Sequence, residues 1–252
     1  MGNLIGKETW SRCSEKLASK EAKEYELSYE RSTTMPKSPF AGEYEPKFLP
    51  PVGLAGSKQI YNMDVLNENV NDGNQGTQMD AFGHFSHTQE KWDGESDLKA
   101  EDAKYFGGFT QKEVKPSLDS PLLKLGMETV PPIITSAILL DVRKHIFKGK
   151  PMEAGQYVTV EHLKKTIELS GLSERGLKPG DVVLINTGWS DHYEDPDISK
   201  SYYSNAPASS YETAKFLRPK KEVAVGLDTP FVDAVPNPNS EKIFKMPGGM
   251  PD

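Results

Sequence analysis

The chain has 252 residues, of which 36% are hydrophobic and 27% charged, so it can bury a sizeable core in one domain. Its net charge of −7, without a basic stripe, argues against a nucleic-acid partner. The single cysteine, Cys13, excludes an internal disulfide and favours a reducing, cytoplasmic location, and no apolar run approaches the roughly 18 residues of a membrane span.

The first 70 residues predict a helix, two strands and a long connection. Apolar residues at intervals of three and four predict a helix over 9–20, and alternating tyrosine and leucine predict a half-buried strand over 23–29. The proline-rich stretch 32–56 is either a lid or an arm onto another subunit. Pro50-Pro51 are expected to exclude regular structure there, and a second strand is expected over 58–70.

A turn and a dense set of possible metal ligands follow that strand. Asn-Asp-Gly at 71–73 permits a tight turn, and oxygen and nitrogen donors come next, at Asn74, Gln78, Asp80 and His84. If the segment turns helical after residue 77, Asp80 and His84 share one face, because residues four apart are neighbours on a helix. These donors suit zinc and harder divalent ions, although such a pair alone is weak evidence for a metal.

The second half of the chain predicts alternating strands and helices. Residues 88–130 are hard to place and are interpreted as an elaboration over a pocket, with one helical turn at 101–106. The apolar run 132–142 predicts a strand buried on both faces, and Asp141 at its end is expected to cap a turn in preference to lining a site. A helix capped by Thr159 is expected to run to about residue 170.

Three further elements complete the pattern. A turn at 178–181 leads into a predicted strand over 182–186 and then Thr-Gly-Trp at 187–189. A capping box formed by Ser209 and Glu212 predicts a helix over 211–217. A last strand over 222–227 ends in Asp-Thr-Pro.

These motifs resemble those of the cyclase family of metal-dependent hydrolases, which includes kynurenine formamidases, isatin hydrolases and trans-dienelactone hydrolases. The family signature reads H-x-G-T-H-x-D-x-P-x-H, and this chain matches it at Gly76, Thr77, Asp80 and His84. The similarity runs from about residue 25 to 235 and is strong again at 139–142, 179–189 and 226–229.

Three signature positions differ from the family. Asn74 and Gln78 stand where the family has two histidine ligands, and Phe82 replaces the proline. Amide and carboxylate oxygens are ligands that harder ions prefer, so these replacements favour manganese over zinc. A later His and Glu complete the family's metal site, whereas the last histidine here is His192. Truncation, ligands from another segment or subunit, and a degenerate site all remain open as explanations.

The resemblance implies an α/β fold, a single domain over 1–252 with a mixed, partly barrel-like sheet flanked by helices and without the family's C-terminal segment. It also implies a homodimer or homotetramer. The metal, Mn or Zn, would bind Gln78, Asp80 and His84, with His84 acting as a ligand or as the general base. The residues expected to contact a small-molecule substrate are Asn74, Thr77, Phe82, His87 and Trp189. For His87 a surface or capping role is favoured, and for Trp189 a plain core role is equally open.

The function favoured by this resemblance is metal-dependent hydrolysis of a small cyclic ester or amide, a lactone first, by activated water. One alternative is arylformamidase activity, of the kynurenine formamidase type. The other is a non-catalytic homologue with a degenerate metal site.

Overall fold

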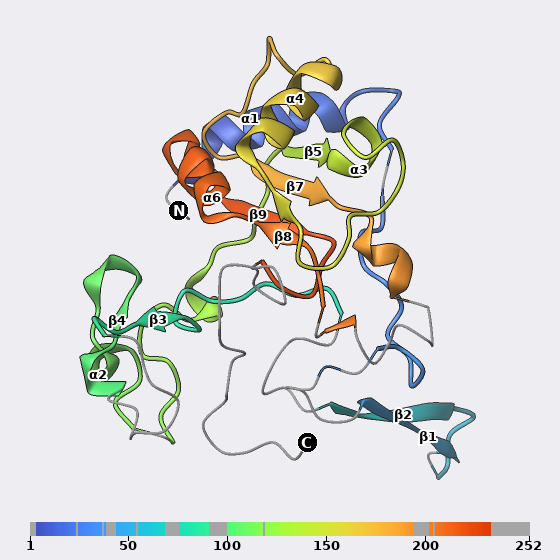
Figure 1. Cartoon of the computed structure of the whole chain (residues 1–252). Helices are drawn as coiled ribbons and strands as arrows, with labels where there is room; N and C mark the ends of the chain where they lie inside the picture. Colours follow the sequence, from blue (N-terminus) through green and yellow to red (C-terminus); the bar gives the residue numbers. More distant parts are fainter. Residues whose placement is uncertain are drawn as a thin grey trace.

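A computed structural model of the chain describes residues 4–23, 25–36, 38, 44–53, 55–68, 76–90, 100–117, 119–193, 202–203 and 205–232. Its main core is built on a parallel sheet in the order β5-β7-β9 (Figure 1). The register pairs Ala137 with Val182 and Val182 with Ala224, so the three strands begin together and their carboxyl ends form one edge. The strands are β5 (Ala137–Asp141), β7 (Val182–Asn186) and β9 (Ala224–Leu227).

One face of this sheet is buried. Ile138 and Leu140 are buried, whereas Leu139 between them is 55% exposed, so the prediction that β5 is buried on both faces is wrong. The buried face packs with side chains of α3, α4 and α6 in one hydrophobic cluster. These helices are α3 (Val142–His145), α4 (Val160–Leu169) and α6 (Tyr211–Leu217).

The helices begin where local capping predicts, with one correction. The Thr159 hydroxyl accepts a hydrogen bond from the His162 N–H at 3.2 Å, which fixes the start of α4 as predicted. Helix α6 has the predicted bounds, but its cap is Ser210, whose hydroxyl accepts from the Thr213 N–H at 3.1 Å. Ser209 cannot cap the helix because it lies in β8 (Ala208–Ser209), which pairs in parallel with β6 (Tyr157–Val158).

Helix α1 (Lys7–Leu17) confirms the predicted N-terminal helix and packs against the turn before β7. The carboxylate of Asp181, which is fully buried, accepts hydrogen bonds from both terminal nitrogens of Arg175, at 2.6 and 2.9 Å, and from the Lys178 N–H at 2.8 Å. Arg12 of α1 lies 3.7 Å from the same carboxylate and donates to the Pro179 carbonyl at 3.1 Å. Asp181 therefore joins α1, the turn and the central strand.

The N-terminal half contains a hairpin that Figure 1 shows apart from the parallel sheet. It consists of β1 (Tyr44–Gly53) and β2 (Ile60–Glu68), so the expected strand over 58–70 is confirmed. The expectation that Pro50-Pro51 exclude regular structure is wrong, because β1 runs through them with a register shift between Leu49 and Val52. A bulge accommodates proline because it leaves residues outside the ladder.

The predicted strand over 23–29 is also wrong, since its described residues have no strand structure. A third pair of strands lies near the predicted metal-binding segment, with a short 3-10 turn over Ala100–Asp102 where a helical turn was expected over 101–106. The two strands are β3 (Ser86–His87) and β4 (Lys104–Tyr105), and a short helix, α2 (Gln111–Val114), follows them.

The chain contains both helices and strands, in agreement with the predicted α/β class. The described strands form four small sheets, each purely parallel or purely antiparallel, and none of them closes into a barrel. None of the described helices combines the length and hydropathy needed to cross a bilayer.

Candidate functional site

The segment 76–84, which carries the signature residues, begins against aromatic side chains. Gly76 has φ +89°, the region that favours glycine, and a Cβ built on it would lie 3.5 Å from the Tyr193 hydroxyl oxygen. The same position lies 3.7 Å from Nε of Arg31. The backbone at Gly76 therefore lies beside both side chains, at the start of the segment.

The far end of the segment is fixed by packing and by a backbone hydrogen bond. The Gly83 N–H donates to the Leu125 carbonyl at 3.0 Å, and a Cβ on this buried glycine would lie only 2.8 Å from Leu122 Cδ1. Phe82 stacks on Phe106 with ring centroids 4.5 Å apart. Phe82 thus occupies the family's proline position as a packing residue.

The candidate metal ligands lie on this segment, Gln78 and Asp80 between the two anchors and His84 directly after the second, and all three are exposed. The Gln78 side-chain amide donates to Asp80 Oδ1 at 3.2 Å. The His84 N–H closes a turn on the Ala81 carbonyl at 2.9 Å, and its ring meets Phe85 edge-on at 4.5 Å. The segment forms no helix, so Asp80 and His84 do not share a helix face as predicted. His84 is the last residue of a turn over 81–84.

By their chemistry, these donors suit part of a divalent-ion shell. Asp80 supplies carboxylate oxygens, His84 an imidazole nitrogen, and the Gln78 amide lies beside Asp80, where a half-turn of the amide would present its oxygen. Among the described residues no three His, Cys, Asp or Glu side chains come together in one group. Asn74, the fourth expected donor, lies outside the described residues. A complete shell needs donors beyond the described ones.

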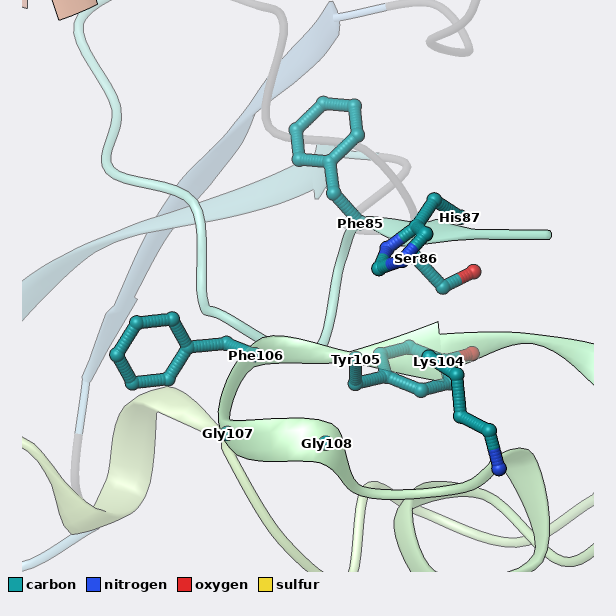
Figure 2. A pocket seen from close by; sticks show the side chains of 8 residues that line it. All are labelled: Phe85, Ser86, His87, Lys104, Tyr105, Phe106, Gly107 and Gly108. Carbon is teal, nitrogen blue, oxygen red and sulfur yellow. The ribbon is translucent and has the colours of Figure 1, made fainter. Parts of the chain in front are cut away.

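An open hollow of about 590 Å³ begins directly after His84 (Figure 2). It lies along the β3–β4 pair, in which His87 stands opposite Lys104. His87 is exposed in β3 and lines the hollow, so it is a strand residue and not a helix cap. The lining residues are Phe85, Ser86, His87, Lys104, Tyr105, Phe106, Gly107 and Gly108. No sequence signal pointed to Lys104, because its pairing with β3 is long-range.

Trp189 lies in a second buried cluster that faces the start of the segment. It is 6% exposed, and its indole N–H finds no acceptor among the described residues. Its ring lies 6.4 Å from Tyr202, and burial raises the pKa of the Tyr202 hydroxyl, which stays neutral. Tyr193 of the same cluster lies beside Gly76. Trp189 therefore reaches the segment through Tyr193.

Asp228 organises the loop that carries Trp189. Its Oδ1 accepts from the Thr187 N–H at 2.8 Å and from the Thr187 hydroxyl at 2.7 Å. Its Oδ2 accepts from the Gly188 N–H at 2.8 Å and from the Ser190 hydroxyl at 3.3 Å. The Ser190 N–H also donates to Oδ2, at 3.5 Å, so one carboxylate satisfies five donors of this loop and fixes the orientation of its backbone.

A polar row at the carboxyl edge of the sheet was the available sequence signal for Asp228. Asp141 ends β5 and pairs in register with Asn186, which ends β7, and Asp228 follows directly after the last paired residue of β9. Asn186 donates to Asp141 at 3.1 Å, and Asp141 accepts from the Lys144 N–H at 2.9 Å as the cap of α3. The prediction that Asp141 caps a turn is confirmed.

We expect Gly188→Ala to lower the free energy of unfolding by about 3 kcal/mol, because it combines a left-handed backbone with overpacking. Gly188 has φ +83°, and a Cβ there would lie 2.7 Å from Arg143 Cδ and 2.9 Å from Pro151 Cα. Gly149→Ala is the matched control, since Gly149 has φ +86° with nothing within 4 Å, and it should cost only about 1 kcal/mol. Equal losses in urea denaturation would show that the packing around Gly188 is unimportant.

A sequence comparison with known protein families identifies the family of this chain. The Cyclase family model matches residues 25–234. A crystal structure of a novel cyclase superposes with a TM-score of 0.75 at 18% identity, covering 92% of this chain and 72% of that one. Isatin hydrolase A from Ralstonia solanacearum gives 0.48 at 16% (82% and 67% covered), and isatin hydrolase A from Labrenzia aggregata bound to benzyl benzoate gives 0.47 at 15% (82% and 68%). No curated protein sequence matches. Because the family model spans most of its length, the chain belongs to the cyclase family.

Proposed function

We propose that this protein is a hydrolase that opens a small cyclic ester or amide, with a lactone as the first candidate. The observation that carries the proposal is the anchored segment 76–84, which presents Asp80 and His84 to solvent beside an open hollow. Family membership supports this reading, since the retained Gly76, Thr77, Asp80 and His84 are the signature positions of the family that the sequence resembles.

The chemistry follows from the donors on the segment. Asp80 and Gln78 would hold a divalent ion, Mn or Zn, which when bound lowers the pKa of water and polarises the substrate carbonyl. In this proposal His84 is not a ligand of the ion but the general base, which would take the proton of the attacking water. The new C–O bond forms at the carbonyl carbon, the ring C–O or C–N bond breaks, and the proton passes to the leaving oxygen or nitrogen. The product is one open-chain carboxylate.

The hollow suits such a substrate. Phe85 and Phe106 at its wall offer apolar contact to a small ring, and the Lys104 ammonium is a cation for the carboxylate that hydrolysis creates. His87 lies across the strand pair from Lys104 and can donate or accept a hydrogen bond. Trp189 acts indirectly in this proposal, through Tyr193 and the backbone of Gly76.

The second candidate is a non-catalytic homologue. It is favoured by one observation, the lack of any group of three ionisable ligands among the described residues. The two candidates differ in a single assay, because only the enzyme turns over substrate.

The test is hydrolysis of an aromatic lactone, a cyclic aryl imide and an N-formyl arylamine by the purified chain, each with Mn²⁺, with Zn²⁺ and with a chelator. The proposal expects metal-dependent opening of the lactone or the cyclic imide, followed as proton release at constant pH. Turnover of the N-formyl arylamine alone would assign the arylformamidase alternative. No turnover of any substrate in the presence of either metal would contradict the enzyme proposal.

A further inference from the structure

The hollow that begins after His84 is lined by one lysine and by no acidic side chain. The lysine is Lys104, and none of the other lining residues is an aspartate or a glutamate. Figure 2 shows the Lys104 side chain extended, with its ammonium nitrogen clear of the other labelled side chains. An anion can therefore enter the hollow without meeting a like charge from its lining, and it meets a cation there.

The ammonium of Lys104 forms no ion pair with any carboxylate among the described residues. Glu113 is close enough for Lys104 to affect its pKa, but this carboxylate already has partners. It accepts from the Thr110 N–H and from the Thr110 hydroxyl, both at 2.9 Å, and it lies 3.8 Å from the Lys124 ammonium. The hydrogen bonds from Thr110 are the main cause of the lowered pKa of Glu113, and the charge of Lys104 has a smaller effect than that of Lys124. Lys104 is thus available to an anion in the hollow.

The strand register places a second hydrogen-bonding group beside this ammonium. His87 stands directly opposite Lys104 in the β3–β4 pair, so the two side chains point to the same side. The Cβ atoms of such a pair lie about 5 Å apart. An ammonium and an imidazole N–H at this spacing can each donate to one oxygen of a carboxylate. The volume of about 590 Å³ suits a small molecule, and Phe85 and Phe106 suit its apolar part.

We infer that the substrate carries a carboxylate of its own, in addition to the ester or amide bond that is hydrolysed, and that Lys104 selects for it. The inference rests on the proposed function, in which the same ammonium meets the carboxylate formed when the ring opens. A neutral ring leaves Lys104 unpaired until that step, whereas an acidic ring pairs with it from the start. An interaction present before and throughout the reaction lowers KM and leaves kcat nearly unchanged. Lys104 is therefore a specificity-determining residue.

The first test compares lactones that differ in charge and hardly in shape. Phthalide-5-carboxylate and phthalide-5-carboxamide share the ring and the ester bond, and the 6-substituted pair places the same groups at another position of the ring. Steady-state kinetics give kcat and KM for the wild type, Lys104→Gln and Lys112→Gln, with the metal that supports turnover. Lys112 is exposed on α2 and lies outside the hollow, so Lys112→Gln controls for the loss of one positive charge.

The wild type is expected to have a KM about tenfold lower for at least one acid than for its amide. Lys104→Gln should remove most of this preference by raising the KM of the acid about tenfold, whereas Lys112→Gln should change it by less than about twofold. Raising the salt concentration from about 50 mM to about 500 mM should weaken the preference of the wild type, because salt screens the attraction between exposed charges. The same salt should have little effect on Lys104→Gln.

A binding measurement separates this inference from the proposed function. The matching 1-indanone carboxylates and carboxamides have a CH₂ group in place of the ring oxygen, so they contain no ester bond to hydrolyse. NMR titration should give a dissociation constant about tenfold lower for one acid than for its amide in the wild type and nearly equal constants in Lys104→Gln. The preference can thus be measured even in a chain that opens no lactone.

Two results would contradict the inference directly. They are equal KM values and equal dissociation constants for acids and amides in the wild type, and a preference that survives in Lys104→Gln. A fall in kcat for acid and amide alike in Lys104→Gln, without a change in the preference, would confine Lys104 to the carboxylate that hydrolysis creates. This result would overturn the inference and leave the proposed function intact. Tighter binding of an acidic indanone through Lys104, without hydrolysis of any lactone, would support the ligand assignment and contradict the proposed function.

Discussion

Replacing His84 by alanine is expected to lower kcat/KM for the substrate that the chain hydrolyses by about 10²- to 10⁴-fold, the usual contribution of a positioned general base. His84 is exposed, and its backbone N–H keeps the turn to the Ala81 carbonyl in the variant, so the fold should not change. The measurement is steady-state kinetics with the substrate identified in the hydrolysis screen, together with a thermal unfolding curve for each variant.

Two histidines provide controls for this variant. His87→Ala removes an imidazole from the same hollow, and we expect a loss of about tenfold or less, because it would contact substrate without taking the proton. His145→Ala removes an imidazole that bonds the Ser170 hydroxyl at 3.2 Å and should leave kcat/KM unchanged. A His87 variant as inactive as the His84 variant would move the base to His87, and an active His84 variant would exclude it as the base.

Asp181→Ala is expected to lower the free energy of unfolding by about 3 kcal/mol, as for the loss of one partner from a buried ion pair. The substitution leaves the guanidinium of Arg175 without its bidentate partner and frees the Lys178 N–H. Asp191→Ala is the control, because its bidentate pair with Arg143 is at the surface, with the Asp191 side chain 44% exposed. It should cost less than about 1 kcal/mol.

The Asp181 contribution should also depend on pH. Burial alone would raise the pKa of Asp181, but the hydrogen bonds from Arg175 and Lys178 and the charge of Arg12 outweigh it and hold the pKa below its usual value. A carboxylate with a lowered pKa in the folded state stabilises the protein above its unfolded pKa, and this stability is lost as the pH falls through the folded pKa. The difference in the free energy of unfolding between wild type and Asp181→Ala should therefore be constant near neutral pH and shrink below about pH 4. A difference that grows in acid would contradict this assignment.

Elements with complete local signals could be predicted from the sequence. Helix α4 has a capping threonine at its start and Gly171 with φ +70° after its end, both readable from the sequence. Strand β7 follows a turn in which Gly180 has φ +85°, and its apolar run leaves few alternatives. In these cases the residues that determine the element lie within it or directly beside it in the sequence.

Elements that depend on distant partners could not be predicted. The alternation of Tyr25, Leu27 and Tyr29 matches a strand, but a strand needs a neighbour to pair with. Tyr29 instead stacks on Tyr193 with centroids 4.5 Å apart and donates its hydroxyl to the Ser190 carbonyl at 3.1 Å. Alternation alone carries no information about whether an edge is available.

The candidate site divides in the same way. The resemblance at Asp80 and His84 was enough to identify the segment. The turn at 81–84 could not be predicted, because Gly83 within it donates a hydrogen bond to the distant Leu125 carbonyl. Asp228 could be recognised only from its local sequence, a motif at the end of a predicted strand, because its five hydrogen-bond donors lie about 40 residues earlier in the chain.

Metal content distinguishes a metal-dependent hydrolase from a homologue that has lost its metal site. The purified chain is dialysed against Mn²⁺ or Zn²⁺, freed of excess ion and analysed by plasma mass spectrometry beside Asp80→Ala and Asp119→Ala, the latter an exposed aspartate outside the segment. We expect about one ion per chain in the wild type and in Asp119→Ala and a near-complete loss in Asp80→Ala. Wild-type protein without metal, or equal metal in Asp80→Ala, would contradict this expectation.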